Sequence, residues 1–368
     1  MNYRLSFNQL SKLPQLLLCF IVINCIFGFV ILYSAGQNNL YPWAIKQMIH
    51  FVIFFVIMLS VAFADIRIIY QYSYSIFFLV IGLLFTVTIS GHSSMGATRW
   101  LNLGGFLKIQ PSELAKLALV LFLSKYFHNL SDKKVKNTLY LIPPSLAIIL
   151  VSGLVILQPD LGTGIVIILV SSILFFISGV KLKIFGIATL CVLSLSPVFW
   201  YKLHDYQKRR IEIFFNPDKD PLGSGYNIIQ SKIAIGSGGF FGRGLGQGSQ
   251  SHLSFLPEHQ TDFIFSCISE DLGFIGGLTL IVIYGIIIYA SLAISINAKA
   301  LYLKFLSIGI VSIFFCHIFI NIGMVTGLLP VVGIPLPLVS YGGTVLGTML
   351  IGFGLIMNIH INHSIKLS

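Results

Sequence analysis

Charged residues are scarce in this sequence. Only 10% of the 368 residues are Asp, Glu, Lys or Arg, whereas 56% are hydrophobic. A soluble globule of this length needs a charged and polar surface that so few residues cannot supply. The composition therefore excludes a water-soluble protein and indicates a chain that crosses a membrane several times.

Acidic residues are fewer still, with 12 Asp and Glu against 23 Lys and Arg. The basic residues concentrate in short segments predicted to share a side with the N-terminus, such as Lys133, Lys134 and Lys136, as expected of cytoplasmic loops. The formal charge of +11 is thus explained by topology and anionic lipid, and it does not argue for a nucleic-acid partner. Both termini are predicted to be cytoplasmic, with the first apolar run an uncleaved anchor.

Cysteine is also rare. The five cysteines fall in predicted spans without metal-ligand spacing or a disulfide pattern, so they are interpreted as small core residues. The glycine-rich stretch 236–248 lacks the Gly-Lys-Ser/Thr ending of a nucleotide-binding loop. Flexible positioning of a bulky substrate is the interpretation that fits it better. No internal repeat of the kind found in many transporters is detected.

Long apolar runs dominate what is present. Because a membrane helix needs about 17–25 apolar residues, the sequence predicts an all-α polytopic membrane protein, one domain over residues 1–368 with about ten transmembrane helices. One long extracytoplasmic loop, about 202–262, is expected, and the eighth helix is long enough to include a tilted or extramembrane turn. The spans are predicted near 15–35, 45–64, 72–91, 112–127, 139–157, 161–179, 183–201, 263–295, 302–325 and 337–359.

Prolines interrupt the last apolar region. Pro330, Pro335 and Pro337 lie within GLLPVVGIPLPLVSYGGT and would break a continuous helix. A broken or re-entrant element at the outer face is therefore predicted. Apart from Cys316 and Tyr341, His317 is the only ionisable side chain between residues 305 and 359.

A run of polar residues leads directly into an apolar segment around Asp262. Glu258 and Asp262 precede Phe263 and Ile264, which places both carboxylates at the mouth of a predicted span. A carboxylate beside apolar surface loses hydration, which raises its pKa and makes it a better base. The alternative is that Thr261 or Asp262 caps the first turn of the helix.

Three further segments carry polar residues on the same predicted outer side. Arg99 and Trp100 could offer a cation and an aromatic platform to a phosphate or sugar, although Trp is also common in the interfacial belt. Asp160, the sole charge in a short turn, either caps the sixth helix or lines a cavity with Asp262. Arg210 ends a basic run that suits lipid headgroups or a pyrophosphate.

An ionisable pair begins the fourth predicted span. Glu113 and Lys116 stand three residues apart, on one face of a helix that starts at Pro111. Charges inside a span are costly unless they meet a partner or a water-filled cavity, so the pair is a candidate functional site. A purely structural salt bridge is the alternative.

Five motifs are spread along the chain: GATRW (96–100), QPSELAK (110–116), QPDLG (158–162), FLPEHQTDFIF (255–265) and PLPLVSYGG (335–343). Together, and over nearly the whole chain, they resemble the SEDS family of shape, elongation, division and sporulation proteins. The chain is more similar to the RodA-like elongation branch than to the division branch. It differs from common family patterns at residues 258–260, Glu-His-Gln, and at residues 269–271, Ser-Glu-Asp.

The resemblance implies a peptidoglycan glycosyltransferase that polymerises lipid II at the outer face of the bacterial cytoplasmic (inner) membrane. It also implies a class B penicillin-binding protein as partner, together with other elongation-complex membrane proteins. Asp262 would be the catalytic general base of an inverting transfer. The residues expected to bind substrate are Arg99, Trp100, Glu113, Lys116, Asp160, Arg210 and Glu258.

Within that mechanism Lys116, Arg99 and Arg210 would neutralise the leaving pyrophosphate, and Glu113 would hold Lys116. Mg²⁺ or Mn²⁺ could assist as a Lewis acid, although no ligand set predicts a tightly held metal or another cofactor. The alternative function is a lipid II flippase, in which the same charged residues would guide a polar headgroup through the bundle.

Overall fold

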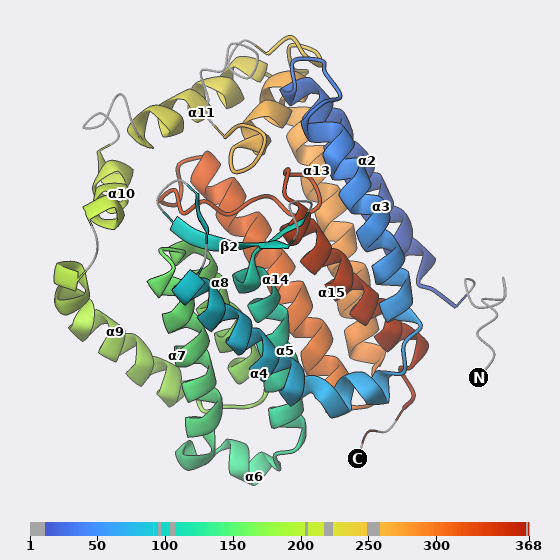
Figure 1. Cartoon of the computed structure of the whole chain (residues 1–368), viewed down its shortest axis with the longest axis vertical. Coiled ribbons are helices and arrows are strands. Elements are labelled where there is room, and N and C mark those ends of the chain that lie inside the picture. Colours follow the sequence, from blue (N-terminus) through green and yellow to red (C-terminus); the bar gives the residue numbers. More distant parts are fainter. Residues whose placement is uncertain are drawn as a thin grey trace.

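The computed structural model describes residues 12–90, 92–94, 97–103, 107–202, 205–216, 224–248, 258–365 and 367. In this part of the chain a helix coincides with each of the ten predicted spans (Figure 1). They are α2 (Gln15–Ala35), α3 (Trp43–Ala62), α4 (Ile66–Ser90), α5 (Pro111–His128), α7 (Ile142–Leu157), α8 (Leu161–Ile177), α9 (Leu182–Lys202), α13 (Ile264–Asn297), α14 (Leu301–Val325) and α15 (Gly343–Ile361).

Seven helices in the described ranges are long and apolar enough to cross a membrane: α2, α3, α4, α13, α14, α15 and the stretch Thr138–Leu157 that contains α7. The apolar helices α8 and Leu182–Pro197 of α9 are shorter, and α5 carries Glu113 and Lys116. The prediction of a helical polytopic membrane protein is confirmed, while the count of ten spans stays a prediction.

The centre of the bundle is formed by α5, α14 and α15. The helix α14 packs against α5, α8, α13 and α15, and α15 also packs against α3. Both α14 and α15 are apolar on all sides, as expected of helices that are buried in a bundle or span a membrane. The start of α2 and the end of α15 lie at the same lower end in Figure 1.

Short elements cover the opposite, upper end. The loop after α4 forms a three-stranded antiparallel sheet of β1 (His92–Ser94), β2 (Ala97–Leu103) and β3 (Leu107–Ile109), in the order β1-β2-β3. This sheet was not expected, because strands this short leave little periodic signal. The long connection contains α10 (Asp205–Phe215) and α11 (Ser224–Gly238). In Figure 1, α9 and α10 stand to the left of the bundle.

The long helix α13 is interrupted at Gly273, which has φ 66° and ψ −161°. The break removes helical partners from nearby backbone groups, and the glycine-rich turn after α11 replaces them. Arg243 N and Gly244 N donate to the carbonyls of Glu270 and Asp271 at 3.0 and 2.9 Å. Phe274 N and Ile275 N donate in return to residues 239 and 240 at 2.9 and 3.3 Å.

This pairing changes the interpretation of the glycine-rich stretch. A Cβ at Gly242 would overlap the carbonyl of Asp271, and one at Gly238 would overlap that of Ser269. The described glycines therefore let two backbones approach closely. Residues 238–244 are packed on the broken part of α13 and are not freely flexible, whereas positioning of a bulky substrate by the stretch 236–248 stays a prediction.

The segment between α14 and α15 has no helix from residue 326 to residue 342, in agreement with the predicted break. The last helix begins at Gly343, six residues later than predicted. Leu338 has φ 66°, and Ser340 Oγ accepts from Leu336 N at 2.8 Å, so a tight turn occupies the start of the predicted span.

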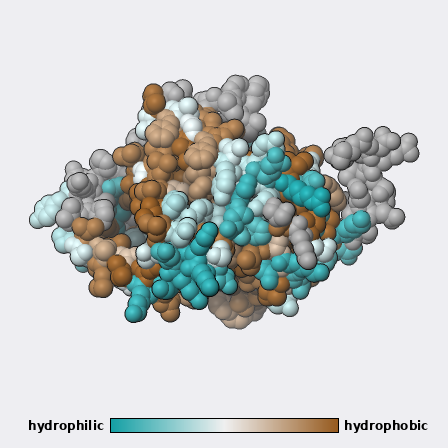
Figure 2. Space-filling view, turned by 90° about the horizontal axis from the view of Figure 1, so that it is seen from below, coloured by the Kyte–Doolittle hydropathy of each residue, from teal (hydrophilic) through white to brown (hydrophobic). Residues whose placement is uncertain are grey.

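Hydrophilic residues gather on the lower end of the bundle. Figure 2 shows this end with a teal region bordered by brown apolar surface. The short helix α6 (Asp132–Val135) lies at this end in Figure 1, and Lys133, Lys134 and Lys136 in and beside it are exposed. The bundle thus has a basic lower end and a separate upper end that carries the sheet and α11.

Candidate active site

Asp262 lies in a tight turn, residues 258–263, immediately before α13. The carbonyl oxygens of residues 260, 261 and 262 each accept a hydrogen bond from the region around the α14–α15 connection. Their donors are Tyr341 N at 2.9 Å, Ser340 Oγ at 2.6 Å and Asn321 Nδ2 at 2.8 Å, respectively. Three successive anchored carbonyls fix the backbone from which the Asp262 side chain projects.

The Asp262 carboxylate does not cap α13. The N-cap residue is Phe263, and no side chain caps the helix there, so the capping alternative is wrong. A Cβ built on Gly333 would lie 3.2 Å from Asp262 Oδ2, which places the carboxylate against the backbone of the α14–α15 connection. Gly333 has φ 74°, a conformation that favours glycine.

The electrostatic surroundings of Asp262 bring the outer charged residues together. The pKa of Asp262 is raised from 3.8 to about 6, chiefly by burial and next by the negative charge of Glu258. Arg210 and Arg99 act in the opposite direction, whereas Asp160 adds a smaller upward contribution to the pKa. Asp262 is therefore mostly ionised at neutral pH and remains basic enough to accept a proton.

Glu258 belongs to the same turn. Its φ is 56°, and Thr261 Oγ1 donates to its backbone oxygen at 3.2 Å and to Oε2 at 3.0 Å. Thr261 therefore bonds within the turn. The Glu258 carboxylate is held near Asp262 by this local pairing.

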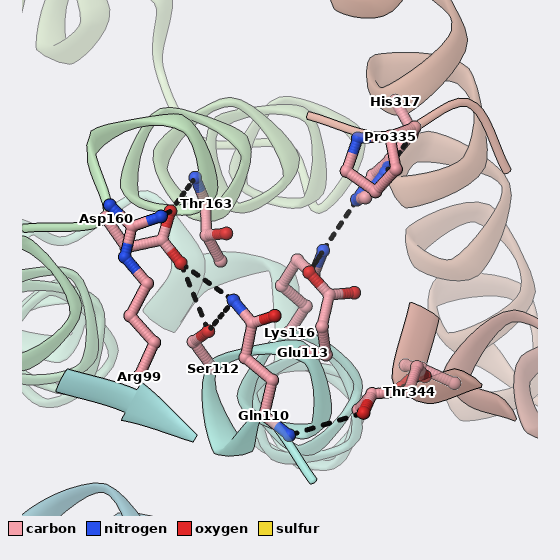
Figure 3. A network of polar contacts seen from close by, with 11 residues as sticks. Arg99, Gln110, Ser112, Glu113, Lys116, Asp160, Thr163, His317, Pro335 and Thr344 are labelled. Carbon is pink, nitrogen blue, oxygen red and sulfur yellow. Dashed lines mark hydrogen bonds and ion pairs between the residues drawn. The ribbon is translucent and has the colours of Figure 1, made fainter. Parts of the chain in front are cut away.

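Asp160 is both a cap and part of a polar network (Figure 3). Its Oδ1 accepts from Thr163 N at 3.3 Å, which confirms the predicted cap of α8. Its Oδ2 accepts from Gln110 Nε2 at 3.0 Å and from Ser112 Oγ at 3.3 Å. Arg99 Nη1 lies 4.0 Å from Oδ1. The network joins β2, α5 and α8 at the upper end.

Arg99 is oriented by the turn that precedes α8. Its Nε donates to the carbonyl of Gln158 at 3.2 Å, and its Nη2 donates to that of Pro159. Because 27% of the Arg99 side chain remains exposed, the turn holds a cation that still faces solvent. Trp100, the next residue of β2, is partly exposed, and both interpretations of its role remain predictions.

Glu113 and Lys116 form the predicted pair, deep in the bundle. Lys116 Nζ donates to Glu113 Oε1 at 2.8 Å, and each residue is 2% exposed. The ammonium also lies 2.6 Å from His317 Nε2, and His317 Nδ1 lies 3.3 Å from the carbonyl of Pro335 (Figure 3). Lys116 is therefore enclosed between two protein groups.

Three buried side chains that bond the backbone around the Asp262 turn and the α14–α15 connection, His317, Asn321 and Gln47, received no role from the sequence. The isolated polarity of His317, Asn321 and Gln47 in apolar helices is the signal that could have identified them. Gln47 Nε2 donates to the carbonyl of Ser340 at 3.0 Å, and Gln47 Oε1 accepts from Gly342 N at 3.2 Å. Gln47 thereby fixes the turn that anchors residue 261.

We searched the side chains of the described residues for a cluster of potential metal ligands. Among the residues that the structure describes, no group of three or more His, Cys, Asp or Glu is placed to hold an ion. Assistance by Mg²⁺ or Mn²⁺ stays a prediction.

The fold and site define a polytopic helical membrane protein with a charged site at one end of its bundle. A family model for FtsW, RodA and SpoVE, described as cell cycle protein, matches residues 14–365. The chain belongs to this family, which confirms the resemblance. It is similar to peptidoglycan glycosyltransferase MrdB of Escherichia coli (strain K12), with 38% identity over 365 residues, 98% of this chain and 96% of the relative.

Solved structures agree with this assignment. A chain of a peptidoglycan synthase complex that coordinates polymerization and crosslinking has a TM-score of 0.82 and 29% identity, covering 95% of this chain and 98% of that chain. The rod shape determining protein RodA of Thermus thermophilus has a TM-score of 0.71 and 25% identity, covering 95% and 97%. Both likenesses extend over nearly the whole fold.

Proposed function

We propose that this chain is a peptidoglycan glycosyltransferase that polymerises lipid II during cell elongation. The observation that carries the proposal is Asp262, a carboxylate of raised pKa in an anchored turn with Arg99 and Arg210 in its electrostatic environment. The relative named peptidoglycan glycosyltransferase, which aligns with 98% of this chain, supports the same activity.

The reaction joins a donor and an acceptor sugar. Asp262 accepts the proton of the acceptor GlcNAc 4-hydroxyl as that oxygen attacks the anomeric carbon of the donor MurNAc. The new carbon–oxygen bond forms as the bond to the pyrophosphate breaks, and undecaprenyl pyrophosphate leaves with inversion. Assistance by a general base accelerates such steps about 10²- to 10⁴-fold.

Arg99 and Arg210 are assigned the role of neutralising negative charge on the leaving pyrophosphate. Arg99 is held by the turn before α8 and remains partly exposed, so its guanidinium is oriented before substrate arrives. Oriented cations stabilise developing negative charge more effectively than groups that must reorganise. Asp160 supports Arg99 from one side, and Trp100 beside it lines the sugar-binding surface.

The enzyme lies in the bacterial cytoplasmic membrane with its site facing outward. The exposed lysines around α6 support a cytoplasmic lower end, because basic loops favour that side. Both termini are then cytoplasmic, and the turn with Asp262 faces the periplasmic side, where the crosslinking partner acts. A class B penicillin-binding protein is the proposed partner, supported by the similar chain in a peptidoglycan synthase complex.

The flippase alternative is less well supported. A headgroup crossing the bilayer needs polar groups at successive depths, whereas Asp262, Arg99 and Asp160 gather at the upper end and Lys116 is enclosed. The activity named for the similar MrdB is also glycosyl transfer.

The two functions separate in one experiment. Purified protein is mixed with lipid II and a partner whose transpeptidase site is inactivated, in detergent and in liposomes. Glycan strands in detergent support the polymerase, because transport has no meaning there. Lipid II movement across liposomes without strands in either system would contradict the proposal.

A further inference from the structure

His317 stands between two parts of the molecule that are far apart in the sequence. On one side, its Nε2 is 2.6 Å from Lys116 Nζ on α5. On the other side, its Nδ1 is 3.3 Å from the carbonyl of Pro335 in the α14–α15 connection. The side chain is 1% exposed, so both neighbours are protein groups in a space closed to solvent.

The partners define the protonation state of the imidazole. Lys116 Nζ donates to Glu113 Oε1 and can only donate to His317, so Nε2 must be the acceptor. The proton then lies on Nδ1, which donates to Pro335 O. An imidazolium in this place would set two cations 2.6 Å apart. The neutral tautomer forms one continuous chain, from Glu113 through Lys116 and His317 to Pro335.

The chain continues to Asp262 through the next turn of α14. Asn321 Nδ2 donates to the carbonyl of Ile334 at 2.7 Å and to that of Asp262 at 2.8 Å. Residues 334 and 335 therefore accept from the side chains of Asn321 and His317, and a Cβ built on the neighbouring Gly333 would lie 3.2 Å from Asp262 Oδ2.

We propose that His317 is a positioning residue, which couples the buried Glu113–Lys116 pair to the segment that aligns Asp262. This inference rests on the proposed function and refines the role expected of Lys116. Because Lys116 is 2% exposed and lies between Glu113 and His317, it acts on catalysis by holding His317. The pyrophosphate is left to Arg99 and Arg210.

The test compares three substitutions at position 317 in the full chain with its partner. His317→Leu removes both the acceptor and the donor. His317→Gln retains an acceptor for Lys116 and a donor for Pro335 O, and the shorter His317→Asn reaches only one of them at a time. His128→Leu is the matched control, since His128 also bonds two neighbouring segments, through Tyr302 N and Leu367 O.

Misalignment of a catalytic group costs rate more than binding, so His317→Leu is expected to lower kcat about 10- to 100-fold with KM for lipid II nearly unchanged. His317→Gln should recover most of kcat, and His317→Asn should be intermediate. The acid limb of the pH–rate profile should also move to lower pH in His317→Leu, because a loosened turn hydrates Asp262. A general loss of folded protein would lower the rate equally at every pH.

The outcomes are separable from those of the proposed function. Lack of polymerisation by the wild type would contradict the function itself. An active wild type with equal kcat and equal pH profile in His317→Leu would overturn the inference. If His317→Leu does not fold, the order wild type, Gln, Asn in kcat supports the inference, and equal values for these three overturn it. His128→Leu should retain the wild-type pH profile.

Discussion

The raised pKa of Asp262 makes the pH dependence of the reaction a sharp prediction. The pKa rises from 3.8 to about 6 because of burial and the charge of Glu258. The value of kcat/KM reports ionisation in the free enzyme. At pH 5 the rate should therefore be about a tenth of its plateau, whereas an ordinary carboxyl of pKa about 3.9 would retain about nine tenths.

Substitution of Glu258 tests the cause of this shift. Glu258→Gln removes the neighbouring negative charge while the amide oxygen can still accept from Thr261 Oγ1, so the turn is retained. The pKa of Asp262 should fall, and the acid limb should move to lower pH. Asp132→Asn, at the opposite end of the bundle, is the control and should leave the profile unchanged.

The assay measures kcat/KM from initial rates of lipid II polymerisation. The pH runs from about 4.5 to about 8 in steps of roughly half a unit, which brackets the expected pKa. A wild-type limb centred near the ordinary carboxyl pKa would refute the reasoning. An identical limb in wild type and Glu258→Gln would show that this charge does not act on the base.

Two further predictions concern stability. Because the folded-state pKa of Asp262 is raised, ionisation of the carboxylate lowers stability as pH rises from about 4 to 6. At pH 7, Asp262→Asn should therefore raise the free energy of unfolding by up to about 3 kcal/mol, measured as a higher thermal midpoint, whereas below about pH 4 the midpoint should not change. Equal midpoints at pH 7 would contradict the burial of this charge. Gly273→Ala should cost about 3 kcal/mol or more, since a Cβ would overlap Gly242 N, whereas Gly285→Ala meets open space and should be neutral or stabilising. Equal loss in both variants would contradict the described break.

The membrane helices were predictable because their signal is local. Each apolar run of sufficient length became a helix, and the prolines marked the break before α15. The i,i+3 spacing of Glu113 and Lys116 gave their salt bridge, and Asp160 in front of an apolar run gave a helix cap. These features depend on residues that are close in the sequence.

The contacts that hold the Asp262 turn in place were not predictable, because they join residues that are far apart in the sequence. Asn321 anchors residue 262 and Ser340 anchors residue 261, from 59 and 79 positions away, and no spacing rule connects them. The role of the glycine-rich turn likewise depends on a distant feature, because it bonds the backbone groups that the break in α13 leaves without helical partners. From the sequence, these glycines indicated only conformational freedom. In the fold, their missing side chains allow the backbone to pack closely against α13.

The most direct measurement is polymerisation of lipid II by wild type and Asp262→Asn at pH 7, each with the partner carrying an inactivated transpeptidase site. Both proteins are first shown to be folded by their thermal transitions. We expect glycan strands from the wild type and a rate lower by about 10²–10⁴ in the variant, because the amide cannot accept the acceptor proton. Strands formed by Asp262→Asn at the wild-type rate would contradict the assignment of Asp262 as the base.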